Sequence, residues 1–276
     1  MLDNYKLIVL AGGFHHCDPS WSRTITGIER CYKIYIPTAG AASIITDTGE
    51  FPLRVGLVYF ISGFRLKTQR CPSRMDVHWL HFMPESLYLR YLLDQAPPVQ
   101  HWPREDEGWT ADACREINRM FTPAAERLQP PREDTPPSTA CRIQGLLLTT
   151  VSKLLRSLDA TTLEDFQPHY YQLKPALDYM QSYYQHNPSL QEIAARVHLA
   201  PTYFHRQFSS LFSISPFQYM LNQRLNRARQ LLSSTSLSIK EIAATVGYDN
   251  SLYFSRVFTT QLGIPPSHYR AMNAEM

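Results

Sequence analysis

The chain has 276 residues, a length that allows two globular domains, and its ordinary balance of 44% hydrophobic and 18% charged residues argues against a disordered chain. No apolar run approaches the roughly 18 residues that span a membrane, and the run from Leu7 to Leu10 is too short for a signal segment, so we expect a cytoplasmic protein with no membrane partner. The five cysteines include no Cys-x-x-Cys pair, which excludes a zinc ribbon and argues against a disulfide framework, and a net charge of +3 does not by itself indicate a polyanion partner.

Residues 1–100 have the pattern of short β-strands. Apolar and aromatic alternation runs through residues 30–36, 43–46, 55–61 and 77–82, and turn residues separate these runs. Many short strands at close spacing are typical of a small β-barrel or a jelly roll. We therefore expect the first domain over residues 1–100.

Residues 101–160 have a helical pattern with one apolar stripe. Its members recur at steps of three and four: Ile143, Leu146, Leu147, Val151, Leu154, Leu155 and Leu158. The stripe fits packing onto the barrel as well as a seam between two copies, and its heptad-like spacing favours the seam. We therefore expect residues 101–160 to hold together a homodimer. Residues 161–170 are polar and lack periodicity, so they are predicted to be a linker.

The C-terminal part, residues 171–276, contains an internal duplication. Residues 189–197 read Ser-Leu-Gln-Glu-Ile-Ala-Ala-Arg-Val, and residues 238–246 read Ser-Ile-Lys-Glu-Ile-Ala-Ala-Thr-Val, an offset of 49 residues. After a short turn, Tyr-Phe-x-Arg-x-Phe follows in both copies at an offset of 50 residues. Each copy opens with a Ser-x-x-Glu capping box, and a second helix follows the turn. This order predicts two helix-turn-helix units.

The second helix of each copy is predicted to have a buried and an exposed face. Phe204 and Phe208 are four residues apart and should face the core, whereas Arg206 lies about 200° from each and points outward. Arginine, histidine, serine and threonine suit base edges, and an exposed leucine suits a thymine methyl group. The predicted base-contacting residues on these faces are Thr202, His205, Arg206, Leu252, Ser255 and Arg256.

A long helix, Phe217 to Leu232, is predicted between the two copies. Its sixteen residues span roughly 24 Å, which could hold two recognition helices near the spacing of successive major grooves. From His169 onward nine basic residues stand against five acidic ones, a balance of +4 that supports a polyanion partner alongside such a motif. The predicted phosphate contacts are Arg196, Arg224 and Arg227.

The stretch from Lys174 to Arg270 closely resembles the DNA-binding domain of the AraC/XylS transcription regulators. The resemblance is carried by residues 225–232, 242–248, 253–258 and 263–270. It implies a regulator that reads adjacent major grooves of a double-stranded DNA operator, and that contacts RNA polymerase if it is an activator. The resemblance also places base contacts on Thr202, His205, Arg206, Ser251, Ser255 and Arg256. His198 departs from the pattern, because glycine or another small residue is common at that turn.

The first domain resembles, less closely, the cupin-like sensor domain of sugar-responsive members of the same family. The β pattern and the run from His78 to Phe82 carry this resemblance. It implies a small-molecule effector, such as a sugar, and dimerisation through the following helices. The expected effector contacts are Trp79, His78, Arg23 and Trp21. On its strand Trp79 shares a face with His81, and Leu80 lies on the other face.

The sequence thus predicts an α+β protein with a cupin-like β-domain and a C-terminal all-α domain. Two alternatives stay open: a metal-dependent cupin enzyme with a DNA-binding appendage, and a constitutive regulator without a ligand. His78 and His81 are three residues apart on a predicted strand and point to opposite faces, so they cannot chelate one ion together. We therefore expect no metal, no cofactor and no enzymatic activity.

Overall fold

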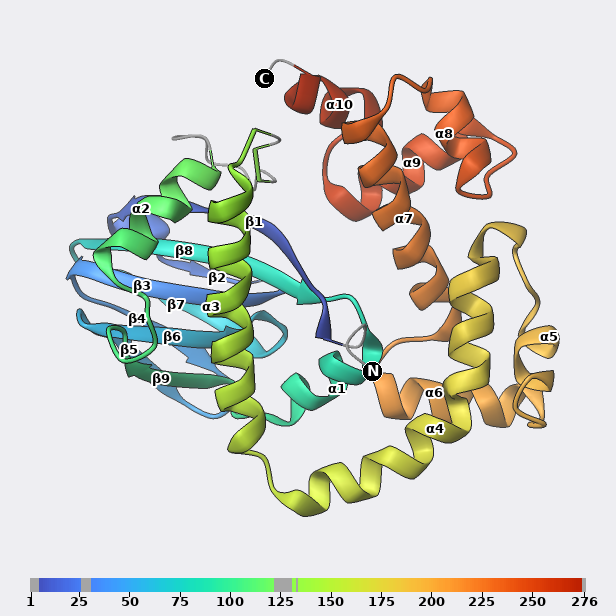
Figure 1. Cartoon of the computed structure of the whole chain (residues 1–276), viewed down its shortest axis with the longest axis horizontal. Coiled ribbons are helices and arrows are strands. Elements are labelled where there is room, and N and C mark those ends of the chain that lie inside the picture. The colour runs from blue at the N-terminus through green and yellow to red at the C-terminus, as the bar shows by residue number, and fades with distance from the viewer. Residues whose placement is uncertain (1–4, 26–30, 122–130, 133, 275–276) are drawn as a thin grey trace. The chain divides into compact units, whose positions relative to one another are not determined.

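The computed structural model describes residues 5–25, 31–121, 131–132 and 134–274. The chain divides into two compact units, Met1–Thr162 and Leu163–Met276 (Figure 1). The first unit combines β-sheets with helices and the second is helical, which confirms the α+β class. Among the described helices, none has the length and apolar character to cross a membrane.

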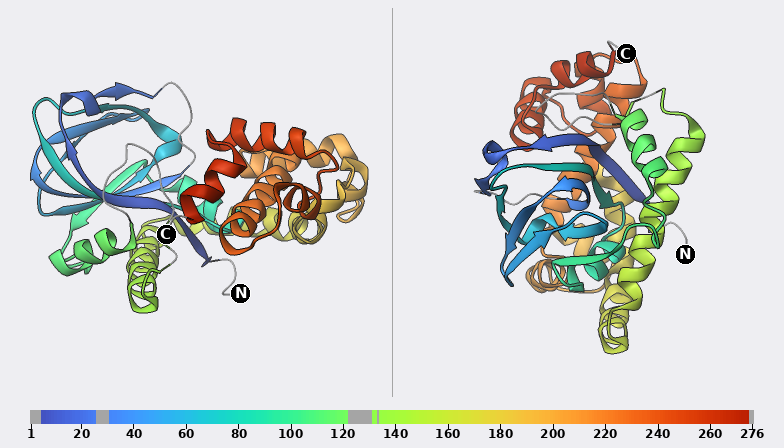
Figure 2. Two further views of the ribbon diagram at one scale, coloured as in Figure 1. Left: turned by 90° about the horizontal axis from the view of Figure 1, so that it is seen from above. Right: turned by 90° about the vertical axis from the view of Figure 1, so that its left-hand side faces the viewer.

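The strands of the first unit form two antiparallel sheets (Figure 2). One sheet has the strand order β1-β8-β3-β6-β9 and the other β2-β7-β4-β5, so the fold is a two-sheet, jelly-roll-like arrangement and not a closed barrel. The strands are β1 (Leu7–Cys17), β2 (Arg23–Thr24), β3 (Tyr32–Gly40), β4 (Ala42–Thr46), β5 (Glu50–Leu53), β6 (Leu57–Ser62), β7 (Leu66–Arg70), β8 (Met75–Pro84) and β9 (Val99–Pro103).

Alternation along the strands gives the five-stranded sheet two apolar faces. One face meets the four-stranded sheet, and Tyr35, Tyr59 and Val77 pack there with Ile44 and Leu53 of the second sheet. The other face is covered by helices α1 (Leu87–Gln95), α2 (Ala111–Met120) and α3 (Pro137–Arg156). Strand β8 therefore lies between two different hydrophobic clusters, one on each of its faces.

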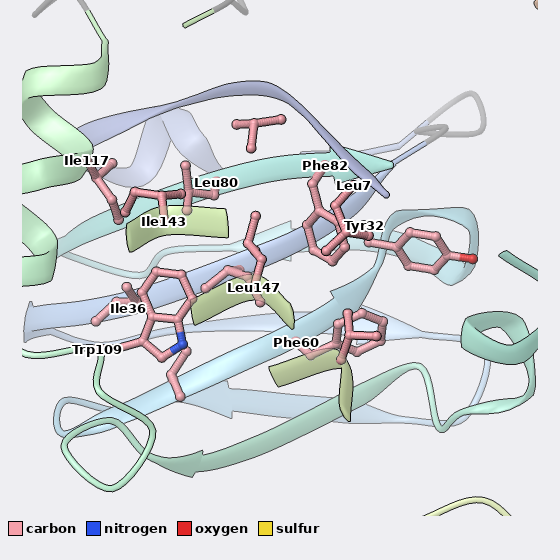
Figure 3. Close-up of a cluster of buried hydrophobic side chains, with 14 of the residues drawn as sticks. Leu7, Tyr32, Ile36, Phe60, Leu80, Phe82, Trp109, Ile117, Ile143 and Leu147 are labelled. Atoms are coloured by element: carbon pink, nitrogen blue, oxygen red, sulfur yellow. The ribbon is translucent and has the colours of Figure 1, made fainter. Parts of the chain in front are cut away.

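Helix α3 packs its apolar stripe on the sheet of its own chain (Figure 3). Ile143, Leu147, Val151 and Leu154 are fully or almost fully buried in the cluster that contains Leu80 of β8. The expected dimer seam at this stripe is therefore wrong, because side chains buried in the core are not available to a second copy. Heptad-like spacing also suits one helix that packs against a flat sheet. Residues 101–160 belong to the first compact unit, and the homodimer stays a prediction.

The second unit begins within helix α4 (Ala160–Tyr183), which runs through the predicted linker at residues 161–170. The linker prediction rested on missing apolar periodicity. A segment that contains leucine, glutamate and glutamine can be helical without such periodicity, because helix propensity does not depend on an apolar stripe. The remaining elements are the 3₁₀ turn η4 (Tyr184–His186), α5 (Leu190–Ala195), α6 (Pro201–Phe212), α7 (Pro216–Ser234), α8 (Ile239–Thr245), α9 (Ser251–Leu262) and α10 (Pro266–Ala274).

The duplication extends to a third helix in each half. Helices α7 and α10 begin at Pro216 and Pro266, which continues the offset of 50 residues. In the first half, Phe208 lies 5.6 Å from Phe204 and 6.2 Å from Tyr219, measured between ring centroids. In the second half, the corresponding three rings at positions 254, 258 and 269 are separated by 5.7 Å and 5.7 Å. Each half thus has its own three-helix core, and the two cores are built in the same way.

Candidate nucleic-acid interface and candidate effector face

Both predicted capping boxes are present and fix the start of the first helix in each half. The amide of Ser189 donates to Glu192 Oε2 at 2.6 Å, and the amide of Glu192 donates back to Ser189 Oγ at 3.2 Å. Ser238 and Glu241 repeat the pair at 2.7 and 3.2 Å. Hydrogen bonds from the serines hold the pKa of both glutamates below the ordinary value. These carboxylates satisfy free amides at the positive end of each helix.

The turn after each capped helix contains one residue with left-handed backbone. In the first half it is His198, with φ of 55°, and in the second half it is Gly247, with φ of 90°. Glycine adopts this conformation freely, whereas a residue with a Cβ is strained there. The departure noted at His198 is therefore accommodated by the same turn geometry. The turn directs the second helix across the first, which is helix-turn-helix geometry.

The second helices, α6 and α9, have the buried and exposed faces that their sequences predict. Phe204 and Phe208 are fully buried, as are their counterparts in α9, and Arg206 and Arg256 are exposed. Thr202 and Leu252 are exposed on the same outer faces, and Leu252 is 73% exposed. The other three predicted base-contacting residues are partly exposed: His205, Ser251 and Ser255.

Two exposed tyrosines were missed in the sequence. Tyr203 is 45% exposed and Tyr253 is 60% exposed, at equivalent positions in the first turns of α6 and α9. The Arg206 guanidinium lies 5.4 Å from the centre of the Tyr203 ring, which helps to orient its fork. The sequence does contain a signal that could have identified them, because tyrosine recurs at an offset of 50 residues. A largely exposed aromatic ring at the same position of both copies suits a surface that meets a partner.

The three predicted phosphate-contacting arginines have different surroundings. Arg196 is exposed and its guanidinium lies 4.0 Å from the centre of the Tyr179 ring. Arg227 is also exposed, and its Nη1 donates to Gln230 Oε1 at 3.2 Å. Arg224 is only 8% exposed and binds oxygen atoms of its own chain, so its assignment to phosphate is wrong. A buried guanidinium saturated by carbonyl groups is not available to DNA.

In the first unit, most of the predicted effector residues gather near the face that meets the four-stranded sheet. Trp79 pairs with Tyr35 across strands β8 and β3, and His81 pairs with Lys33. The ring centroids of Trp79 and His81 are 4.7 Å apart. Trp21 lies 6.4 Å from Tyr35 by the same measure. The sequence did not assign Lys33 or Tyr35 to the site, although a lysine within an apolar strand was a signal.

Arg23 lies on β2, opposite this face, and its Nε donates to Gln69 Oε1 on β7 at 3.1 Å. The pKa of His81 is well below its ordinary value, first because of burial and then because of the positive charges of Lys33 and Arg23. His81 is therefore neutral, and one ring nitrogen must accept while the other donates.

The surroundings of His81 decide which nitrogen donates. Lys33 Nζ lies 3.0 Å from His81 Nε2, and an ammonium group can only donate, so Nε2 accepts and Nδ1 carries the proton. His81 Nδ1 is buried and has no hydrogen-bond partner among the residues that the structure describes. A buried donor without an acceptor is costly. This face therefore holds one buried N–H group that has no acceptor among the described residues.

His78 is separated from this face by the strand itself. Its side chain lies on the side of the sheet that carries α2, with Nδ1 3.2 Å from Asn118 Oδ1 and its ring 4.7 Å from Phe14. Because neighbouring residues of a strand point to opposite faces, His78 cannot act beside Trp79. We therefore leave His78 out of the proposed effector site.

Over the described parts of the chain, no three His, Cys, Asp or Glu side chains gather in a way that could hold a metal ion.

Residues 193–272 match a family model described as a helix-turn-helix domain. The arabinose operon regulatory protein of Escherichia coli is 32% identical over 119 residues, which cover 43% of this chain and 41% of that protein. The transcriptional regulator GbdR of Pseudomonas aeruginosa is 40% identical over 81 residues, 29% of this chain and 22% of its own length. The MmsAB operon regulatory protein of the same species is 34% identical over 92 residues, 33% and 30% of the two chains. The matches span less than half of the length of each of these relatives.

Among solved structures, ToxT from Vibrio cholerae has a similar fold over nearly the whole chain. The crystal structure of ToxT covers 99% of this chain and 99% of its own at a TM-score of 0.51 and 13% identity. A second ToxT structure, bound to a naphthalenyl butenoic acid, covers 96% and 99% at a TM-score of 0.53 and 12% identity. At this identity the likeness concerns the fold alone.

Proposed function

We propose that the second unit is a DNA-binding domain of the AraC/XylS family, and that the chain is a transcription regulator that binds double-stranded DNA. The observation that carries the proposal is the repeated outer face. Two helices in equivalent surroundings each bury a pair of phenylalanines and expose an arginine at the same position. An arginine that only faces solvent has no reason to recur at the same position of both helices. Two helices that each read base edges do require an exposed arginine at equivalent positions.

In this proposal α6 and α9 enter successive major grooves. Arg206 and Arg256 read base edges, and Leu252 meets a thymine methyl group. Arg196 and Arg227 are proposed to contact phosphates, because both are exposed and neither is paired with a carboxylate in the described structure. The remaining proposed base contacts are Thr202, His205, Ser251 and Ser255.

Replacing Arg206 or Arg256 with alanine should weaken the base preference at one position of the operator in each variant. The two affected positions should lie about one helical turn of DNA apart. Loss of a bidentate contact to guanine should lower affinity for the preferred site by about 10- to 100-fold. Selection of preferred sequences from random duplexes by the full chain measures both changes.

Arg227→Ala is the matched control on α7. It should weaken binding to all duplexes by a similar factor, because a phosphate contact carries no base information. Equal weakening on every sequence by Arg206→Ala or Arg256→Ala would instead assign these arginines to phosphates. A full chain that binds all duplexes equally would contradict the proposed function itself.

We further propose that the face of β3 and β8 that meets the second sheet binds a small polar effector, with a sugar or a related metabolite as first candidate. Trp79 supplies an aromatic face and His81 Nδ1 a buried donor for an oxygen atom of the ligand. Trp21 lies near Tyr35 on this face, and Arg23 is close enough to His81 for its charge to lower the pKa of that histidine. An aromatic plane with a few fixed polar groups suits a hydroxylated molecule.

A thermal-shift screen of sugars and related metabolites on the full chain tests this site, because a ligand of the native state raises the melting temperature. Trp79→Ala should reduce the affinity for the active compound by about 10- to 100-fold, since it removes the stacking surface. His78→Ala, on the opposite face of the same strand, should leave the affinity unchanged. If the folded Trp79→Ala protein binds the active compound as tightly as the wild-type protein does, Trp79 is excluded from the site.

A further inference from the structure

The guanidinium of Arg224, at the middle of α7, contacts both halves of the second unit. Its Nε donates to the carbonyl oxygen of Tyr184 at 2.8 Å, and its Nη2 donates to the same oxygen and to Asn187 Oδ1. Its Nη1 donates to the carbonyl oxygen of Gly247 at 3.4 Å. Tyr184 and Asn187 precede the first helix-turn-helix, whereas Gly247 is the turn residue of the second.

The two carbonyl groups lie at the negative ends of two helices. Tyr184 directly follows the last residue of α4, and Gly247 lies just beyond α8, so both oxygens lie at the C-terminal ends of helices. A cation at this position satisfies the carbonyl groups and interacts favourably with both helix dipoles. Arg224 therefore caps one helix from each half. None of its hydrogen-bond partners in the described structure is a carboxylate, so its burial depends on these oxygens being in place.

The backbones joined by Arg224 also touch directly. A Cβ added to Gly247 would lie 2.2 Å from the carbonyl oxygen of Gln185. The side-chain amide of Asn187 donates to the carbonyl oxygen of Gly247 at 3.3 Å. Arg224, the segment 184–187 and the Gly247 turn thus form one joint, and this joint lies beside the long helix that connects the two halves. A single connecting helix can bend or twist, but a helix with a lateral joint cannot do so without breaking these contacts.

We propose that Arg224 is a positioning residue that fixes the spacing and rotation between α6 and α9, and with them the distance between the two DNA segments that the protein reads. The inference rests on the proposed DNA-binding function. It assigns no DNA contact to Arg224. It predicts that loss of the joint leaves base recognition by each helix intact. The protein should then accept a wider range of distances between the two DNA segments.

The test uses the full chain and the operator selected by the wild-type protein, together with duplexes that carry one base pair more or less between the two recognised segments. One base pair displaces the second segment by about 3.4 Å and rotates it by about 35°. Wild-type affinity should fall about tenfold for either change, because protein or DNA must deform. For Arg224→Gln this penalty should shrink to less than about threefold, with unchanged base preference within each segment.

Arg227→Gln, three residues further along the same helix, is the matched control and should weaken binding equally on all three duplexes. A folded Arg224→Gln protein that keeps the tenfold penalty overturns the proposal. If circular dichroism shows that this variant does not fold, Arg224→Lys and Asn187→Ala test the same joint with milder changes. An unchanged penalty in both overturns the proposal equally. Failure of the wild-type protein to select any operator would be a failure of the proposed function and is seen before any variant is made.

Discussion

Replacing Leu147 with glutamate is expected to unfold the first unit, with a loss of about 4 kcal/mol or more in its free energy of unfolding. Leu147 is fully buried between α3 and the five-stranded sheet. A carboxylate at this position would either be ionised without a partner or force water into the core. Denaturant titration followed by tryptophan fluorescence measures the effect on this unit alone, because all four tryptophans of the chain lie in it: Trp21, Trp79, Trp102 and Trp109.

Leu148→Glu provides the control at the adjacent position. Leu148 is 42% exposed on the outer side of α3, so a charge there should change the free energy of unfolding by less than about 0.5 kcal/mol. The pair distinguishes core packing from a dimer seam. A Leu147→Glu protein that stays folded and only dissociates in the ultracentrifuge would contradict the packing of the stripe on its own sheet.

Replacing Gly247 with alanine is expected to destabilise the second unit by about 2–5 kcal/mol, which combines left-handed strain with overpacking. The added Cβ would lie 2.2 Å from the carbonyl oxygen of Gln185 and 2.7 Å from its Cα, and backbone atoms cannot swing aside as a side chain can. The joint around Arg224 would have to open to make room. Thermal unfolding followed by circular dichroism measures the loss.

His198 occupies the equivalent turn of the first half and gives the reciprocal experiment. Its side chain is exposed, and only its φ of 55° is unfavourable. His198→Gly should therefore raise the free energy of unfolding, by less than about 1 kcal/mol, because relief of strain exceeds the added flexibility of the unfolded chain. Tolerance of alanine at position 247 would show that the contact with Gln185 is absent in solution.

The periodic parts of the sequence predicted the helical half of the fold well. A spacing of four residues between Phe204 and Phe208 fixes which side of α6 is buried, whatever lies against it. The capping boxes likewise depend on residues three apart, so local sequence determines them. The third helix of each half was missed as part of the repeat, because its matching residues, a proline and a tyrosine, are few.

Features that depend on contacts distant in sequence could not be predicted in this way. Arg224, Arg227 and Arg229 lie on one helix, and the first of them is buried because the segment 184–187, about forty residues earlier, and the Gly247 turn, later in the chain, lie against it. The stripe on α3 fits a sheet and a partner helix equally well. Trp79 and Leu80 occupy opposite faces of β8 by simple alternation, but the sequence does not say which face meets the second sheet.

The three-helix repeat also has a historical consequence. Two copies of one ancestral segment began with the same requirements at every position. Tandem fusion made their neighbourhoods unequal, because the turn at Gly247 lies against the segment 184–187, whereas the turn at His198 is exposed. Selection therefore tolerates fewer substitutions at the turn of the second copy than at the turn of the first. The first copy has more freedom to acquire new side chains at its turn, and with them new DNA preferences, without loss of the joint that holds the pair together.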